Sequence, residues 1–181
     1  MVIKISDTTK NYLLCEARKS IYNELGIDYK NNHTYIGDEI SVKYGAFVTL
    51  NKNNQLRGCI GIMVGTKPIA DTIRDMAKSA AFNDNRFMPV TKEELDNIQI
   101  EITILSPLKS TTIDEIEVGR DGLLLEYKGF YGVLLPQVAV NHNWSKEEFL
   151  DNLCIKAGLD KNTWREKNIT LYRFSGYIFS E

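Results

Sequence analysis

The sequence is poor in the residues that build disulfide frameworks and metal sites. It holds three cysteines and two histidines among 181 residues. The cysteines, Cys15, Cys59 and Cys154, lie far apart with no CxxC pair, and an odd number of separated thiols argues against a disulfide framework. His33 and His142 have no cysteine or carboxylate at metal-ligand spacing. We therefore expect no disulfides, no metal site and no cofactor.

Long apolar runs and an excess of charge of one sign are also absent. No stretch approaches the roughly 18 apolar residues of a membrane-spanning helix, and residues 1–10 lack the features of a secretory signal. The 22 basic and 24 acidic side chains give a net charge of -2, which provides no general attraction to nucleic acid. We expect a soluble, cytoplasmic protein that binds neither a membrane nor nucleic acid.

The residues that are present are typical of a globular protein with helices and strands. Hydrophobic residues make up 43% and charged residues 25% of the chain, and this length suits one domain, or one domain with two lobes. Helices are predicted over 8–25, which Gly26 ends, from Pro68, briefly from Thr91, and from Ser145 to Gly158. The Ser145 helix begins with a capping box that Glu148 completes.

The predicted strands follow an order that occurs twice. Strands are predicted over 45–50, 55–64, 98–105, 123–127, 130–138 and, as one or two strands, 169–179. The order strand, turn, strand, helix, strand covers Gly45 to Leu105 and again Gly122 to Phe179, with Gly58 at the place of Gly132. The fold class is therefore α+β, with antiparallel sheets, packed helices and a weak internal quasi-repeat.

One strand carries an unusual stretch, LRGCIG, from Leu56 to Gly61. Period-two alternation places Arg57 and Cys59 on one face and Leu56 on the other, the core face. Glycine weakens a strand, so Gly58 and Gly61 indicate a bulge, a tight backbone contact or the approach of a ligand. An arginine beside a cysteine favours the thiolate, which makes Cys59 a candidate nucleophile.

A plainer interpretation stays open for each of these residues. Cys59 is then a small packed hydrophobe, Arg57 a surface cation, and the glycines only let the hairpin twist. Glu101, on the polar side of an isoleucine-rich strand, is either a solvated carboxylate or a general acid or base. Neither GxxxxGK[ST] nor a GxGxxG sequence opening a helix is present, which argues against a nucleotide-phosphate site.

Several short motifs together resemble one known family. They are FVTL at 47–50, LRGCIG at 56–61, DNRF at 84–87, EITILS at 101–106, LPQV at 135–138 and AGL at 157–159. In this order the chain resembles the AmmeMemoRadiSam system protein A family, also called the AMME-syndrome chromosomal region candidate family, over about 11–179. LRGCIG is the family signature. The family commonly has Asp-Pro-Arg-Phe where this chain has Asn85 after Asp84, so a rigid turn is lost.

The resemblance implies a single AMME-type domain, residues 1–181, with a larger and a smaller antiparallel-sheet lobe and a cleft near the signature. It also implies a Memo-like protein and a radical SAM protein as partners. Within that cleft, Arg57, Gly58, Gly61, Arg86 and Gln137 are the expected binding residues.

Two functions remain open. The chain is either an enzyme subunit of the modification system, with Cys59 as nucleophile, Glu101 as acid or base and two arginines that bind an anion, or a non-catalytic adaptor that binds a partner through the same cleft. Arg57, Cys59 and Arg86 are expected to converge.

Overall fold

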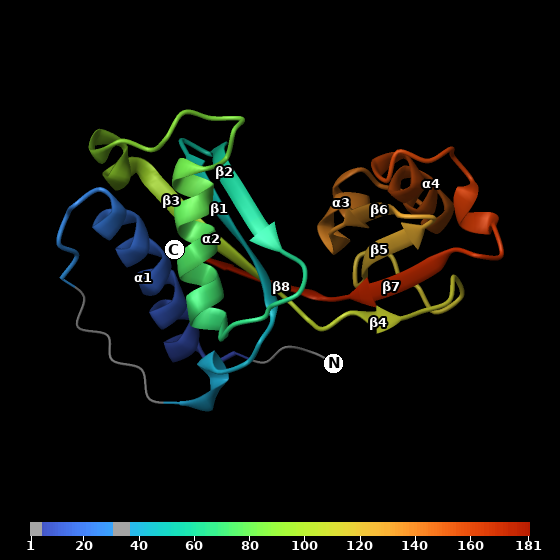
Figure 1. The fold of residues 1–181 in the computed structure, drawn as a ribbon, viewed down its shortest axis with the longest axis horizontal. Coiled ribbons are helices and arrows are strands. Elements are labelled where there is room, and N and C mark those ends of the chain that lie inside the picture. The colour runs from blue at the N-terminus through green and yellow to red at the C-terminus, as the bar shows by residue number, and fades with distance from the viewer. Residues whose placement is uncertain (1–4, 31–36) are drawn as a thin grey trace. The chain divides into compact units, whose positions relative to one another are not determined.

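A computed structural model describes residues 5–30 and 37–181; His33 lies outside the described residues. The chain divides into two compact units, each described here by itself (Figure 1). The first unit contains the described residues up to Leu105 together with Tyr177–Glu181. The second unit contains Ser106–Gly176. None of the described helices combines the length and the apolar character needed to cross a membrane.

The first unit is an antiparallel sheet with two helices on one face, as Figure 1 shows. Its elements are α1 (Asp7–Glu24), η1 (Asp38–Ile40), β1 (Gly45–Lys52), β2 (Gln55–Ile62), α2 (Ile69–Phe82), η2 (Lys92–Asn97), β3 (Ile98–Leu105) and β8 (Gly176–Ser180). The strand order is β2-β1-β3-β8, which makes β2 an edge strand. The short helix predicted at Thr91 is η2, which is a 3-10 helix.

Strand alternation decides which side chains enter the core of the first unit. The buried residues beneath α1 and α2 include Ala46, Val48, Leu50, Ile98, Ile100, Ile102 and Ile104. Their neighbours along the strands, Phe47, Thr49 and Glu101, lie on the opposite face and are only partly buried. The sheet therefore has one face buried by helices and one face with polar side chains.

Gly58 provides the close approach between β2 and α2. A Cβ atom on Gly58 would lie 2.2 Å from the carbonyl oxygen of Ala80, far inside van der Waals contact. On the other face, a Cβ on Gly61 would meet the ring of Phe47 at 2.3 Å, because the aromatic ring covers the glycine across the hairpin. Of the three interpretations of these glycines, the contacts support tight packing at both, and a register shift beside Gly58 also supports a bulge there.

The predicted core position of Leu56 is wrong, since its side chain is 45% exposed. The register shifts between Leu50 and Asn51, so that Leu50 faces Gly58 while Asn51 faces Leu56. Arg57 is the extra residue of this bulge, and a bulge reverses the alternation beyond it. The bulge moves Leu56 off the core face.

The second unit repeats the plan of the first. Its elements are β4 (Lys109–Ser110), β5 (Gly122–Tyr127), β6 (Phe130–Leu134), α3 (Pro136–Asn141), α4 (Lys146–Lys156), η3 (Thr163–Arg165) and β7 (Thr170–Phe174). The strand order β4-β7-β5-β6 contains the arrangement β6-β5-β7, which matches β2-β1-β3. A Cβ on Gly132 would lie 2.6 Å from the carbonyl oxygen of Leu153 on α4, so Gly132 repeats the contact of Gly58.

One predicted strand of the second unit needs correction, and the last predicted run divides into two strands. The strand predicted over 130–138 ends at Leu134, because Pro136 begins α3; proline suits the first turn of a helix and cannot donate to a sheet. The run predicted over 169–179 as one or two strands forms two, β7 and β8, which belong to different sheets. Cys154 is fully buried on α4.

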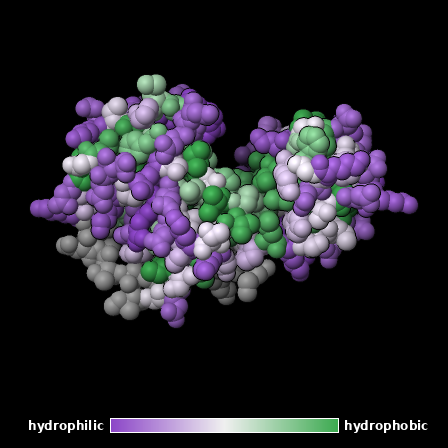
Figure 2. All heavy atoms as spheres, in the orientation of Figure 1, coloured by the Kyte–Doolittle hydropathy of each residue, from purple (hydrophilic) through white to green (hydrophobic). Residues whose placement is uncertain are grey.

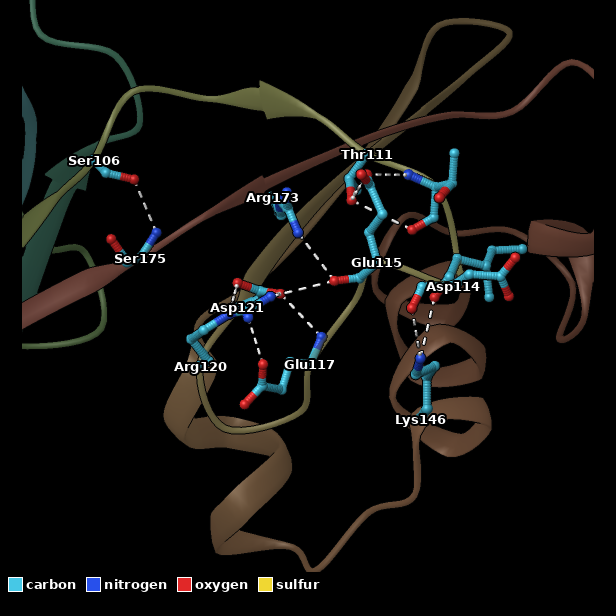
Figure 3. Close-up of polar contacts among 12 residues, drawn as sticks. Ser106, Thr111, Asp114, Glu115, Glu117, Arg120, Asp121, Lys146, Arg173 and Ser175 are labelled. Carbon is cyan, nitrogen blue, oxygen red and sulfur yellow. Dashed lines mark hydrogen bonds and ion pairs between the residues drawn. The ribbon is translucent and has the colours of Figure 1, made fainter. Parts of the chain in front are cut away.

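A buried aspartate organises the loop that leads into β5 (Figure 3). Asp121, 5% exposed, accepts hydrogen bonds from the backbone N–H of Glu117 at 2.9 Å and from Nε of Arg120 at 2.9 Å. Nη2 of Arg120 and Nη1 of Arg173 both donate to the carbonyl oxygen of Glu115, at 3.2 and 3.0 Å. These bonds fix the loop to β7.

Replacing Ser145 with alanine should lower the stability of the protein by about 1 kcal/mol. The Ser145 hydroxyl accepts from the backbone N–H of Glu148 at 3.3 Å, and the Glu148 carboxylate accepts from the N–H of Ser145 at 2.8 Å. The variant loses the first bond of this capping box. Urea unfolding measures the change, and an unchanged midpoint contradicts the assigned helix start.

Gly58→Ala should destabilise the protein by roughly 1–3 kcal/mol, because α2 must move away from the added methyl group. Thermal and urea unfolding report the loss. Gln55→Ala, at an exposed position on the same strand, is the control and should stay within about 0.5 kcal/mol of the wild type. Equal stability of the two variants would refute the contact.

Candidate functional site

The loop that follows α2 closes the outer edge of β2 at Cys59. An edge strand leaves backbone groups without a strand partner. Here the backbone N–H of Cys59 donates to Oδ2 of Asp84 at 2.9 Å, and its carbonyl oxygen accepts from Nη2 of Arg86 at 3.1 Å. Side chains of the loop thus take the place of a neighbouring strand.

Asp84 and Arg86 form the ion pair that makes this closure. Nε of Arg86 donates to Oδ1 at 2.9 Å, Nη2 donates to Oδ2 at 2.6 Å, and the backbone N–H of Arg86 donates to Oδ1 at 3.2 Å. The Arg86 side-chain hydrogen bonds, helped by the Cys59 N–H, hold the pKa of Asp84 well below its usual range. The Asp84 side chain is 3% exposed and that of Arg86 53%, so the carboxylate is buried and the guanidinium faces solvent.

Arg57 makes a second ion pair, with Glu94 of η2. Its Nε and Nη2 donate to the two carboxylate oxygens at 3.0 Å each, and Nη2 also donates to the carbonyl oxygen of Met88 at 2.8 Å. The same carboxylate accepts from Nζ of Lys52 at 2.9 Å and from the N–H of Thr91 at 3.0 Å. The bonds from Arg57, followed by those from Lys52 and Thr91, lower the pKa of Glu94 to about 2.

The side chains of both arginines lie near the ring of Phe87. The guanidinium carbon of Arg57 is 6.0 Å and that of Arg86 5.5 Å from the centre of the Phe87 ring, within the range of cation–π contacts. The two arginines therefore meet around one aromatic ring. Nη1 of Arg57 is buried and has no hydrogen-bond acceptor among the described residues.

The thiol of Cys59 lies next to a hydroxyl group rather than a free cation. Oγ1 of Thr49 donates to its sulfur at 3.3 Å. Thr49 stands opposite Cys59 on one side and opposite Glu101 on the other, so the three residues form a row across the sheet. The Glu101 side chain is partly buried and has no hydrogen bond or ion pair to another side chain in the part of the chain that the structure describes.

The structure brings Arg57, Cys59 and Arg86 together. A cysteine's sulfur lies within roughly 5 Å of its own carbonyl oxygen by covalent geometry, and Arg86 bonds that oxygen. Gln137 lies in the second unit, on α3, where its side chain is partly buried. The catalytic role of Cys59 and the binding roles of these residues stay predictions.

Sequence reasoning missed the two carboxylates that pair with the arginines. Asp84 is part of the motif DNRF, in which the sequence predicts a binding role for the arginine alone. The spacing of Glu94 after Thr91 predicts a helix cap, and the observed bond between Glu94 and the Thr91 N–H agrees with it. The pairing with Arg57, 37 residues earlier, has no local sequence signal.

Metal ligands do not gather at this site. No group of three or more His, Cys, Asp or Glu side chains with metal-binding geometry occurs among residues 5–30 and 37–181. His142 is exposed and stacks on Trp144, with ring centres 4.7 Å apart.

Comparisons with known proteins connect the chain to uncharacterised relatives. A model of the AMMECR1 family matches residues 14–179. A protein of Methanococcus aeolicus is 44% identical over 146 residues, which cover 76% of this chain and 73% of the relative. A protein of Methanocaldococcus jannaschii is 43% identical over 148 residues, covering 77% and 74%. The crystal structure of an uncharacterised protein from Pyrococcus horikoshii has a TM-score of 0.85 at 36% identity, covering 99% of this chain and 94% of that chain.

Replacing Glu94 with glutamine should lower the stability of the folded protein at neutral pH, and this loss should be smaller at acidic pH. Glu94 has an ordinary pKa of 4.5 and about 2 in the folded protein, so its ionised form contributes stability that is present above pH 4.5 and lost as the pH falls through 2. The free-energy difference between wild type and variant should therefore shrink from pH 6 toward pH 2.

Urea unfolding at a series of pH values measures this difference. Glu24→Gln removes an exposed carboxylate of α1 and serves as the control, with no comparable narrowing. A pH-independent difference for Glu94→Gln would show that the ion pair with Arg57 does not form in solution.

Proposed function

This chain belongs to the AMMECR1 family, and we propose that it is an accessory, non-catalytic component of the AmmeMemoRadiSam modification system. In this proposal the protein binds partners of the system, the Memo-like protein and the radical SAM protein, through the surface around LRGCIG. The loop 83–91 and strand β2 form this surface.

The proposal rests on the hydrogen bonds within the chain that already engage the signature residues. Both outward backbone groups of Cys59 are taken by Asp84 and Arg86, and the guanidinium of Arg57 is taken by Glu94 and Met88. Each arginine has its own carboxylate, so their charges are already compensated. These groups hold a loop in place, as an interaction surface requires, and leave little unneutralised charge to activate a thiol or bind a small anion.

A thiol enzyme is the second candidate, and one contact favours it. The hydroxyl of Thr49 donates to the sulfur of Cys59 at 3.3 Å, and a hydrogen bond to the sulfur stabilises a thiolate. Glu101 stands on the next strand of the same row and would serve as the acid or base. If the protein is a thiol enzyme, Cys59 is required for the modification. If it is a non-catalytic adaptor, Cys59 is a packing residue.

Cys59→Ala separates the two candidates. The tagged protein is co-expressed with a Memo-like protein and a radical SAM protein, and co-purification and the mass of the modified product are measured. We expect the variant to retain both the partners and the modification. A variant that keeps its partners but loses the modification would establish the enzyme. Failure of the wild type to retain either partner would refute the proposed function.

A further inference from the structure

The outer edge of β6 in the second unit lacks the closure that the edge of β2 has. Both strands end their sheets, since the strand orders are β2-β1-β3-β8 and β4-β7-β5-β6. On β2 the loop after α2 supplies Asp84 and Arg86 to the backbone of Cys59. The segment after α4 turns back onto its own helix instead, where Nε1 of Trp164 donates to Oδ1 of Asp151 at 2.7 Å.

Two residues of β6 direct their backbone groups away from the sheet. Both residues of the turn at 128–129 have positive φ angles, which is typical of a two-residue type I′ turn between the partners Tyr127 and Phe130. The N–H of Phe130 therefore points toward β5. Because paired and unpaired residues alternate along a strand, the N–H and C=O groups of Tyr131 and Val133 point outward.

The internal repeat leads to the same strand edge. Gly132 packs against α4 as Gly58 packs against α2, so Val133 corresponds to Cys59, whose backbone groups point outward. In the part of the chain that the structure describes, no hydrogen bond engages the outward backbone groups of Tyr131 and Val133. The edge therefore offers one N–H donor and one C=O acceptor at each of these residues.

β6 also lacks the features that protect an edge strand from pairing. Its sequence, FYGVL at 130–134, contains no charge and no proline, and its pairing with β5 has no bulge. Phe130 is 50% and Tyr131 60% exposed, on opposite faces of the strand. Figure 2 shows green, hydrophobic atoms at the surface of the second unit, in the part of the view where Figure 1 draws α4 and β6. An added strand would cover part of both aromatic rings.

A lone strand fits this edge better than a second copy of the protein does. A Cβ on Gly132 would lie 2.6 Å from the carbonyl oxygen of Leu153, so α4 lies directly over β6. Two paired β6 strands would lie about 5 Å apart, whereas packed helices keep their axes about 8–10 Å apart. The two α4 helices would therefore compete for the same space.

We propose that the edge of β6 binds an extended segment of a partner protein by strand addition. The segment pairs with the outward N–H and C=O groups of Tyr131 and Val133. Its side chains are uncharged and β-branched or aromatic at alternate positions, because such side chains pair best beside the rings of Tyr131 and Phe130. The site lies within the second unit and is independent of the binding role proposed for the signature.

A fluorescein-labelled peptide, Glu-Val-Thr-Val-Tyr-Val-Lys, tests the proposal on the full chain by fluorescence anisotropy. The unmodified peptide should bind at concentrations below about 1 mM. The same peptide N-methylated at its valine, threonine and tyrosine residues cannot donate backbone hydrogen bonds, and it should bind at least about tenfold more weakly.

Hydrogen exchange followed by NMR locates the bound peptide. The backbone N–H groups of Tyr131 and Val133 should exchange with solvent more slowly when the unmodified peptide is bound. The N–H of Gly132 points toward β5 by the same alternation, and it should exchange at an unchanged rate.

Two proline variants compare the edges of the two sheets. Val133→Pro removes an outward N–H without removing a bond to β5, and it should weaken peptide binding by about tenfold or more. Ile178→Pro, on the edge strand β8, is the matched control and should bind within about twofold of the wild type. The N–H of Glu181 donates to the carbonyl oxygen of Ile100, so alternation turns the N–H of Ile178 away from β3.

Five results would overturn the proposal: no binding by the wild type up to about 1 mM unmodified peptide, equal binding of the N-methylated peptide, equal binding by Val133→Pro, loss of binding in Ile178→Pro alone, or self-association of the free protein that Val133→Pro abolishes. The fourth result would move the site to β8, and the fifth would identify a second copy as the occupant. Urea unfolding checks that both variants fold, and the N-methylated peptide keeps the test decisive if Val133→Pro does not.

Discussion

The carboxylate of Asp84 is the group on which the signature region depends. It is nearly fully buried and accepts bonds from the backbone of Cys59 and from the side chain and backbone of Arg86. A buried carboxylate without such donors would be strongly destabilising, so strand and loop must keep their positions together. Because Gly58 holds the other side of β2 against α2, the strand is fixed both at its edge and on its core face.

The second unit also contains a buried aspartate paired with an arginine, which here holds the loop before β5. Buried Asp121 accepts from a backbone N–H and from Arg120, and Arg120 in turn donates to the carbonyl oxygen of Glu115 (Figure 3). In the first unit Arg86 likewise donates to the carbonyl oxygen of Cys59. The aspartate precedes the arginine in one unit and follows it in the other, so an alignment of the two halves hides the likeness that the geometry reveals.

Local patterns predicted the parts of the fold that depend on local physics. The alternation over Ile98–Leu105 placed one face in the core, and the capping box at Ser145 located a helix start. What the sequence did not reveal depends on tertiary contacts: the bulge at Arg57 that exposes Leu56, and the pairing of Arg57 with Glu94. A bulge leaves no mark on composition, and an ion pair between distant segments exists only once the fold has formed.

This pairing also changes what the candidate site can do. An arginine two residues from a cysteine favours the thiolate only while its charge is uncompensated. With both carboxylate oxygens of Glu94 at 3.0 Å from Arg57, and Asp84 bonded to Arg86, each arginine has an adjacent anion that opposes its effect on the thiol. Among the described residues of the signature region, Nη1 of Arg57 is buried without a hydrogen-bond partner, and Met88 and the outward part of Arg86 are exposed. The geometry at the signature therefore favours the proposed binding role over thiol catalysis, and the hydroxyl of Thr49 is a hydrogen-bond donor to the Cys59 sulfur.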